Sequence, residues 1–300
     1  MINEKFVSDV KSIGAECVTE SLMKDHTTFR IGGPADYFIT VANIEQLKSV
    51  VKLCKEQDIP FMLLGNGSNL LVDDNGLRMA VIRLAGEFKE INHKENTVTC
   101  GAGATLARLC TYSMQNSLSG LEFAFGIPGT VGGAVFMNAG AYGGEMKDVL
   151  TTVTHLTPDG EIETVSVDTL DLGYRHSIYK NNGCIILSAD FTLKEGNKDD
   201  IKALMDDIMN RRVTKQPLEY PSAGSVFKRP EGAFAGALIE QCGLKGLTVG
   251  GAQVSTKHSG FIINIGGATC CDVCNLVEKI QQIVKDETGF TLEREIIRLS

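Results

Sequence analysis

Two glycine-rich segments of the chain have a spacing suited to holding a phosphate group or a flat ring. The first, GNGSN at 65–69, follows a short apolar run. Gly65 and Gly67 allow left-handed backbone angles and close approach of a ligand, and successive N–H groups in such a turn can point at an anion. No helix follows directly and no GK[ST] is present, so this is neither a G-x-G-x-x-G turn nor a P-loop. A tight turn between two strands is the alternative interpretation.

The second segment, GIPGTVGGAVFMNAGAYGG at 126–144, has seven glycines in nineteen positions. Each glycine costs backbone entropy on folding, so the segment must lie against something that leaves no room for side chains. A flat ring or a diphosphate fits this requirement. A second backbone that crosses the turn closely is the alternative.

Three clustered cysteines, Cys270, Cys271 and Cys274, resemble part of a metal site. The cluster has only one C-x-x-C pair and no nearby histidine, which disfavours a metal centre. The residues that follow have apolar side chains at helical spacing. We therefore interpret the cysteines as the start and core face of a helix whose apolar positions are Val273, Leu276, Val277, Ile280 and Val284.

The elements that must position these segments are a mixture of helices and strands. Apolar periodicity and flanking Pro, Gly or Asn predict helices at 43–58 (with Asn43 as N-cap), 105–117, 198–212, 234–242 and 272–288. Alternating or short apolar runs predict strands at 61–64, 79–84, 183–194, 261–266 and 292–299, a strand and turn over 97–104, and a hairpin over 149–167 that turns at 158–160. Residues 1–20 suggest a short amphipathic helix and a connector.

The composition is that of an ordinary globular protein, with 43% hydrophobic and 22% charged residues. The net charge of −8 disfavours a general nucleic-acid-binding surface. No apolar run approaches the roughly 18 residues of a membrane helix, and the N-terminus lacks a signal-peptide pattern. Nine cysteines without an export signal indicate reduced thiols in the cytoplasm.

The order of the patterns suggests three parts. The first strand–helix–strand unit ends near residue 86, and a second begins at 87. The polar stretch EGNKDD interrupts the pattern near 196. We expect parts at 1–86, 87–196 and 197–300.

Seven segments together resemble the MurB family, the UDP-N-acetylenolpyruvoylglucosamine reductases. They occur in the family's order and span nearly the whole chain. The interval between YRHS and AGSVF is short and is similar to the compact class of the family, which lacks a tyrosine-bearing lid loop. The matching segments are TTFRIGGPADYF (27–38), LGNGSNLLV (64–72), GIPGTVGGAVFMNAGAYG (126–143), YRHSIYK (174–180), AGSVFKRPEG (223–232), LIEQCGLKGLTVGGAQVSTKHSGFIIN (238–264) and LEREI (292–296).

The resemblance implies an α+β fold. Parts 1–86 and 87–196 would be the two subdomains of an FAD-binding domain of the vanillyl-alcohol-oxidase/PCMH type, and 197–300 a substrate-binding domain. It implies non-covalent FAD, NADPH as hydride donor, and reduction of a UDP-linked enolpyruvyl sugar to UDP-N-acetylmuramate in cytoplasmic peptidoglycan synthesis. The implied FAD-binding residues are Arg30, Gly65, Asn66, Gly67, Ser68, Asn69, Gly126, Ile127, Pro128, Gly129, Gly132, Gly133, Ala134 and Asn138.

The resemblance also implies three catalytic residues. The Arg175 guanidinium can stabilise charge that develops toward the substrate carboxylate. Ser225 would deliver a proton to the carbon next to the one that accepts the hydride. Glu295 would act as an acid, because a carboxyl buried beside an anion keeps its proton more readily than one in water. Glu293 would share a strand face with Glu295 if the strand were regular, and it is taken as solvent-facing.

Substrate contacts are implied for Tyr174, Lys215 and Arg229, although a solvated basic face would explain the two cations equally well. His26, His155, His176 and His258 are interpreted as structural or surface residues. A flavin-dependent sugar or alcohol oxidase on the same scaffold is the main alternative, and a non-catalytic nucleotide-binding regulator is the second. No metal, nucleic acid or membrane partner is expected, and no oligomeric state is inferred.

Overall fold

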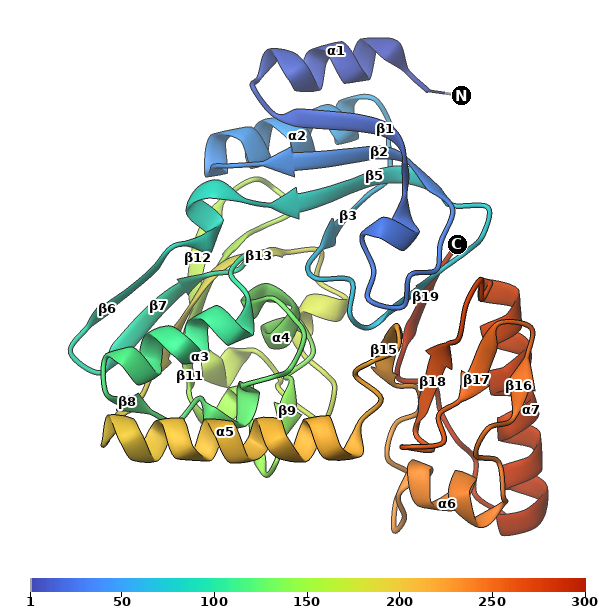
Figure 1. Cartoon of the computed structure of the whole chain (residues 1–300). Helices are drawn as coiled ribbons and strands as arrows, with labels where there is room; N and C mark the ends of the chain where they lie inside the picture. Colours follow the sequence, from blue (N-terminus) through green and yellow to red (C-terminus); the bar gives the residue numbers. More distant parts are fainter. Residues whose placement is uncertain (1) are drawn as a thin grey trace. The chain divides into compact units, whose positions relative to one another are not determined.

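The computed structural model describes residues 2–300, which form an α+β chain (Figure 1). The chain divides into two units, each assembled from separate stretches of sequence. Unit 1 comprises 2–18, Phe38–Asn66 and Ala80–Arg211, and unit 2 comprises Thr19–Tyr37, Gly67–Met79 and Arg212–Ser300. The α-helices are α1 (Glu4–Ser12), α2 (Ile44–Glu56), α3 (Leu106–Gln115), α4 (Val131–Phe136), α5 (Lys198–Lys215), α6 (Ala235–Gln241) and α7 (Cys270–Thr288).

The largest sheet of unit 1 is antiparallel, with the strand order β12-β11-β13-β7-β6. Helix α4 packs beside its central strand. The strands are β6 (Ile91–Lys94), β7 (Thr97–Gly101), β11 (Leu150–Leu156), β12 (Ile162–Ser166) and β13 (Ile185–Thr192). Two short antiparallel pairs accompany it, β9 (Gly140–Ala141) with β10 (Gly144–Glu145) and β8 (Leu118–Ser119) with β14 (Lys194–Glu195).

A second sheet has the order β1-β2-β5-β3. Its strands are β1 (Glu16–Leu22), β2 (Pro34–Val41), β5 (Leu77–Leu84) and β3 (Phe61–Leu64). The last two run parallel, with Phe61 opposite Ala80. The loop at 65–69 therefore leaves the carboxyl end of β3.

Unit 2 contains an antiparallel sheet with the order β15-β18-β17-β16, against which α7 packs (Figure 1). Its strands are β15 (Ser222–Ser225), β16 (Thr248–Val249), β17 (Ala252–Val254) and β18 (Phe261–Asn264). The last strand, β19 (Ile297–Leu299), pairs in parallel with β4 (Leu70–Val72). Phe29, Ile31 and Leu71 belong to the same apolar core as α7, so residues distant in sequence complete this unit.

The long amphipathic helices confirm the sequence predictions. Asn43 caps α2 by accepting a hydrogen bond from Gln46 N at 2.9 Å. Helix α7 begins with a capping box between Thr269 and Asp272 and ends at Gly289, which has a left-handed φ of 77°. All five apolar positions predicted for this helix are buried, together with Cys270 and Cys274, whereas Cys271 is exposed. Helical spacing and end signals were sufficient for these elements.

Three local predictions need correction. Residues 16–22 form strand β1 rather than a connector. Its sequence ECVTESL places only Cys17 in the core, so the apolar alternation that marks a strand is weak. The last strand covers only Ile297–Leu299, and Arg294 makes just an isolated bridge with Phe227. The glycine-rich segment also contains a six-residue helix, α4, that its composition does not indicate.

Candidate functional site

The loop after β3 touches the glycine-rich segment within unit 1. A Cβ atom at Gly65 would lie 2.6 Å from Thr130 Oγ1, so a larger residue there would force the Thr130 side chain to move. The same Thr130 oxygen accepts a hydrogen bond from Gly133 N at 3.3 Å and caps α4. Gly65, Asn66 and Gly133 are exposed. Parts of both predicted phosphate-binding segments therefore meet around Thr130.

Gly132 and Gly133 are neighbours in α4, but the surroundings of an added side chain differ between the two positions. A Cβ at Gly132 would lie 3.0 Å from Ala102 Cβ, and Gly132 N donates to Ala102 O at 2.9 Å. The close approach of the Ala102 backbone therefore explains why residue 132 is a glycine, without the need for a ligand. At Gly133 the nearest atom to an added Cβ is 3.4 Å away, an ordinary contact. Packing within the protein does not require Gly133, so its bare, exposed backbone suits the close approach of a ligand.

The chain from 126 to 129 connects the one-turn helix Glu122–Ala124 to α4. Gly126 has a φ of 86°, which favours glycine. Ile127 N donates to Ala124 O at 3.1 Å, and Gly129 O accepts from Leu106 N at 3.0 Å. Of the remaining predicted cofactor residues in this segment, Pro128 is exposed and Ala134 is buried in α4.

The second half of the loop after β3 belongs to unit 2. Gly67 has a φ of 60°, and a Cβ there would lie 2.3 Å from His26 O. Half-buried Ser68 follows, and Asn69 Nδ2 then donates to Glu295 O at 3.3 Å. A residue predicted to bind the cofactor thus supports the backbone of a predicted catalytic residue.

Asn138, predicted to contact the cofactor, has its side-chain amide committed to protein partners. Its Nδ2 donates to Glu145 Oε2 at 2.6 Å and to Gly173 O at 3.1 Å. Its Oδ1 accepts from Lys147 N at 3.0 Å. The residue is 1% exposed, so these contacts define a structural role for the amide.

Arg175 lies in a tight turn of unit 1. Gly173 and His176 pair across the turn through two backbone hydrogen bonds of 3.2 and 3.1 Å. The Arg175 Cζ lies 5.1 Å from the centroid of the exposed Tyr174 ring, a cation–π arrangement. The turn therefore presents a guanidinium and an aromatic ring, the two predicted ligand contacts from the YRHS motif, side by side.

Ser225 ends β15 of unit 2, opposite Phe261 of β18. Its Oγ donates to Phe227 O at 3.3 Å and would lie 3.4 Å from a Cβ placed on Gly260. The preceding Gly224 has a φ of 76°, and the pairing with β18 shifts register before Ser225. The irregular strand end leaves the serine half-buried rather than enclosed.

Glu295 lies beside Ser225 in unit 2. Glu295 N donates to the carbonyl of Val226, the residue after Ser225, at 2.8 Å. Glu295 is half-buried, whereas Glu293 is exposed and pairs with Lys228 Nζ at 3.0 Å. The structure therefore places two of the three predicted catalytic residues on neighbouring segments and gives Glu293 a surface ion pair.

The two predicted cationic substrate contacts both lie in unit 2. Lys215 is the exposed last residue of α5. The Arg229 Cζ lies 3.9 Å above the ring of Phe234, whose side chain is 61% exposed. An exposed cation stacked on an exposed aromatic ring is a surface available to a polar ligand.

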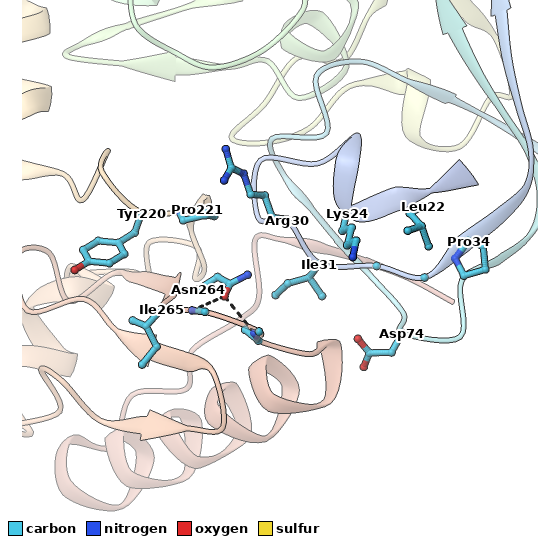
Figure 2. Close-up of a pocket in the computed structure, with 15 residues that line it drawn as sticks. Leu22, Lys24, Arg30, Ile31, Pro34, Asp74, Tyr220, Pro221, Asn264 and Ile265 are labelled. Atoms are coloured by element: carbon cyan, nitrogen blue, oxygen red, sulfur yellow. Dashed lines mark hydrogen bonds between the residues drawn. The ribbon is translucent and has the colours of Figure 1, made fainter. Parts of the chain in front are cut away.

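Arg30 lines a cavity of about 770 Å³ in unit 2 (Figure 2). Lys24, Tyr220 and Asn264 share this cavity. Arg30 has a φ of 54°, a left-handed angle rare for a residue with a side chain. Asn264 Oδ1 accepts from Gly266 N and Ala268 N and shapes the opposite wall. Ser225 and Glu295 are not among the described residues that line the cavity.

Two family models match the chain. An FAD binding domain matches residues 35–166, and the C-terminal domain of UDP-N-acetylenolpyruvoylglucosamine reductase matches 216–299. A curated UDP-N-acetylenolpyruvoylglucosamine reductase of Agathobacter rectalis is 52% identical over 91% of this chain and 91% of its own. The chain belongs to the MurB family of UDP-N-acetylenolpyruvoylglucosamine reductases.

Other MurB relatives match over similar lengths. The reductase of Clostridioides difficile is 50% identical over 91% of this chain and 90% of its own. The crystal structure of the MurB reductase from Thermus caldophilus matches with a TM-score of 0.82 and 41% identity, covering 95% of this chain and 99% of that chain. The expected α+β class, with an FAD-binding domain and a MurB C-terminal domain, is confirmed, and the chain is a flavin-dependent oxidoreductase.

The residues around Thr130 fit the FAD that the MurB family uses together with NADPH. A dinucleotide diphosphate needs backbone that is accessible and free of side chains. Gly65 and Gly133 supply such backbone near Thr130 Oγ1, and Asn66 continues the exposed loop. Within residues 2–300, no helix is long and apolar enough to cross a membrane.

His258 lies near Ser225, a relationship that the sequence motifs do not indicate. A Cβ on Gly260 would lie 3.1 Å from His258 Cε1 and 3.4 Å from Ser225 Oγ, so both side chains border the same glycine. Burial lowers the pKa of His258 below its ordinary value of 6.5. The motif STKHSGF contained this histidine, but sequence alone did not indicate its proximity to Ser225.

Proposed function

We propose that the chain uses NADPH to reduce the enolpyruvyl ether of UDP-N-acetylglucosamine to the lactyl ether, UDP-N-acetylmuramate, for peptidoglycan synthesis. The observation that carries the proposal is the 52% identity to a reductase of that name over 91% of both chains. We infer that the reaction takes place in the cytoplasm, because it uses a nucleotide-linked substrate and NADPH.

We assign FAD to the loop at 65–69 and to residues 126–134, held non-covalently. Bound FAD would supply the hydride chemistry that amino-acid side chains lack. The exposed backbone of Gly65, Asn66 and Gly133 supports this assignment. The FAD binding domain match at 35–166 falls within the two subdomains proposed at 1–86 and 87–196, and the 216–299 match falls within the substrate domain proposed at 197–300.

Arg175 is assigned to the substrate carboxylate. Hydride addition to the methylene carbon sends negative charge toward the carboxylate, and a guanidinium offers paired donors at a fixed geometry. Its left-handed φ of 55° supports a functional role, because strained backbone angles concentrate at functional sites.

Ser225 is assigned as the donor of the proton that the adjacent carbon then requires. A serine hydroxyl is a weak acid, but the carbanion-like intermediate is a strong base. Glu295 is assigned as a second acid or hydrogen-bond donor to the same intermediate. The 2.8 Å bond from Glu295 N to Val226 O supports this pairing, because it joins the two segments that carry the acids.

Tyr174, Lys215 and Arg229 are assigned to the nucleotide-sugar substrate. Lys215 and Arg229 can meet diphosphate oxygens as cations. The Tyr174 ring and the Phe234 ring beneath Arg229 are exposed flat surfaces that a uracil or sugar ring can pack against.

An anaerobic titration tests this function directly. NADPH should bleach the flavin absorbance, and UDP-N-acetylenolpyruvoylglucosamine should then restore it with formation of one equivalent of UDP-N-acetylmuramate. Recovery only on admission of oxygen, with hydrogen peroxide formed, would instead identify an oxidase. A colourless protein to which FAD does not bind would contradict the proposal at its first step.

A further inference from the structure

The turn that carries Arg175 has a backbone conformation that its own residues do not favour. Arg175 has a φ of 55° and is the third residue of the turn closed by Gly173 and His176. Glycine or asparagine is preferred at a turn position with positive φ. Such a conformation persists only when the surrounding structure imposes it.

Asn138 holds the first end of the turn. Its Nδ2 donates to Gly173 O at 3.1 Å, two residues before Arg175. The amide is itself fixed by Glu145 Oε2 at 2.6 Å and by Lys147 N at 3.0 Å. A buried amide with three partners has little freedom, so the Gly173 carbonyl is held in one place.

Ser177 holds the other end. Its side chain is fully buried, and its Oγ donates to Phe136 O at 2.7 Å. Two residues later, the Tyr179 hydroxyl lies 3.0 Å from Nδ1 of the buried His155 on β11. The chain after the turn is therefore fixed to the end of α4 and to the main sheet of unit 1.

We propose that Asn138 and Ser177 are positioning residues that lock the Arg175 turn to the glycine-rich segment. Both hydrogen bonds connect the turn to the C-terminal end of α4, because Phe136 is the last residue of this helix and Asn138 follows two residues later. The segment assigned to FAD and the backbone that carries the Arg175 guanidinium are thus tied together within unit 1. This proposal rests on the proposed function, and specifically on the role of Arg175.

The test separates the two half-reactions by stopped flow. Ser177→Ala should retain FAD and be reduced by NADPH at near wild-type rate. Reoxidation by the enolpyruvyl substrate should slow by up to about 10²-fold, the loss expected when a reacting group is misplaced by about 1 Å. A purely structural role would weaken thermal stability without separating the two rates.

Ser113→Ala is the matched control. Ser113 is also a buried serine of unit 1, and its Oγ donates to a backbone carbonyl, Leu109 O, at 3.0 Å. Ser113→Ala removes a buried hydroxyl within α3 rather than at the turn, and it should leave both half-reactions unchanged. Equal slowing of reoxidation by Ser113→Ala and Ser177→Ala would overturn the proposal.

A double-mutant cycle with Arg175→Lys distinguishes failure of this inference from failure of the proposed function. If Ser177 acts through Arg175, then Ser177→Ala should have little further effect in the Arg175→Lys protein. Additive effects, or a slow Arg175→Lys protein beside a fast Ser177→Ala protein, would overturn the positioning role alone. Wild-type reoxidation in Arg175→Lys would overturn both. Additive effects of Asn138→Ala and Arg175→Lys on reoxidation, measured with FAD in excess, would remove Asn138 from the positioning role.

Discussion

The side-chain amide of Asn69 donates a hydrogen bond to the backbone carbonyl of Glu295 at 3.3 Å. Ile297 N returns a bond to Asn69 O at 2.9 Å, and Glu295 N donates to Val226 O at 2.8 Å. The backbone of the proposed acid is therefore held on both sides, by the loop after β3 and by the strand end after Ser225. In unit 2 the proposed proton donors and part of the proposed cofactor loop form one hydrogen-bonded assembly.

Substitutions at adjacent glycines should separate protein packing from cofactor approach. Gly132→Ala would place a Cβ 3.0 Å from Ala102 Cβ, so we expect lower thermal stability. Gly133→Ala adds a Cβ with only an ordinary contact, so the fold should keep its stability while FAD affinity falls. Differential scanning fluorimetry and FAD titration of the apoprotein measure the two effects. Full FAD affinity in Gly133→Ala would remove this residue from the cofactor site.

Arg175→Lys should not behave as a conservative change. Lysine keeps the charge but loses the planar pair of donors that matches a carboxylate. We expect reoxidation by the enolpyruvyl substrate to slow by about 10²- to 10³-fold, as when one donor to a developing anion is removed. NADPH reduction, measured in the same stopped-flow experiment, should be unaffected. An unchanged turnover number would make Arg175 a structural residue.

The sequence was sufficient to predict helices whose apolar residues recur at regular spacing and whose ends carry capping residues. Helix α7 shows this best, because Thr269 and Gly289 mark its ends and its apolar residues recur at helical spacing. The motifs also predict FAD-binding residues, because glycines at 65, 67 and 133 stand out from ordinary composition, and these assignments stay predictions.

The sequence did not reveal relationships that depend on tertiary packing. Ile297 pairs with Leu70, and Phe29 enters the core under α7, yet no local pattern connects these positions. Gly132 and Gly133 look alike in sequence, but only the structure shows that Ala102 crosses the first of them. For Asn138, no local pattern shows that its side-chain amide binds the carbonyl of Gly173 far along the chain, and its contact with the cofactor stays a prediction.

Stability should decrease in mildly acidic solution because of His258. Burial lowers the pKa of His258 in the folded chain, so the unfolded chain takes up the proton first as the pH falls through 6.5. The unfolding free energy therefore falls below that pH, by at most about 1.4 kcal/mol per pH unit for one proton. In His258→Gln, the melting temperature should depend less on pH between about pH 7 and about pH 5 than it does in the wild type. An identical pH profile in the variant would rule out this histidine as the cause.

The nine cysteines should differ in reactivity toward a thiol reagent such as DTNB. Cys271 is exposed at the start of α7, whereas burial raises the pKa of Cys54, Cys100 and Cys270 to about 12. Only the thiolate reacts, so we expect a single fast thiol in the native protein. Cys271→Ser should abolish the fast phase, and denaturation should expose all nine thiols. A fast phase that persists in Cys271→Ser would show that another thiol is accessible.

The measurement that tests the central claim most directly is the rate of each half-reaction in Ser225→Ala. Ser225 has no part in the reduction by NADPH, so bleaching should proceed at near wild-type rate. Reoxidation by UDP-N-acetylenolpyruvoylglucosamine should slow by at least about 10²- to 10⁴-fold, because the intermediate lacks its proton donor. Ser225→Cys keeps a dissociable proton and should recover part of this rate. Ser222→Ala, at the other end of β15, is the control and should match wild type. Equal slowing of both half-reactions by Ser225→Ala, or no slowing of reoxidation, would contradict the assignment of Ser225 as the proton donor.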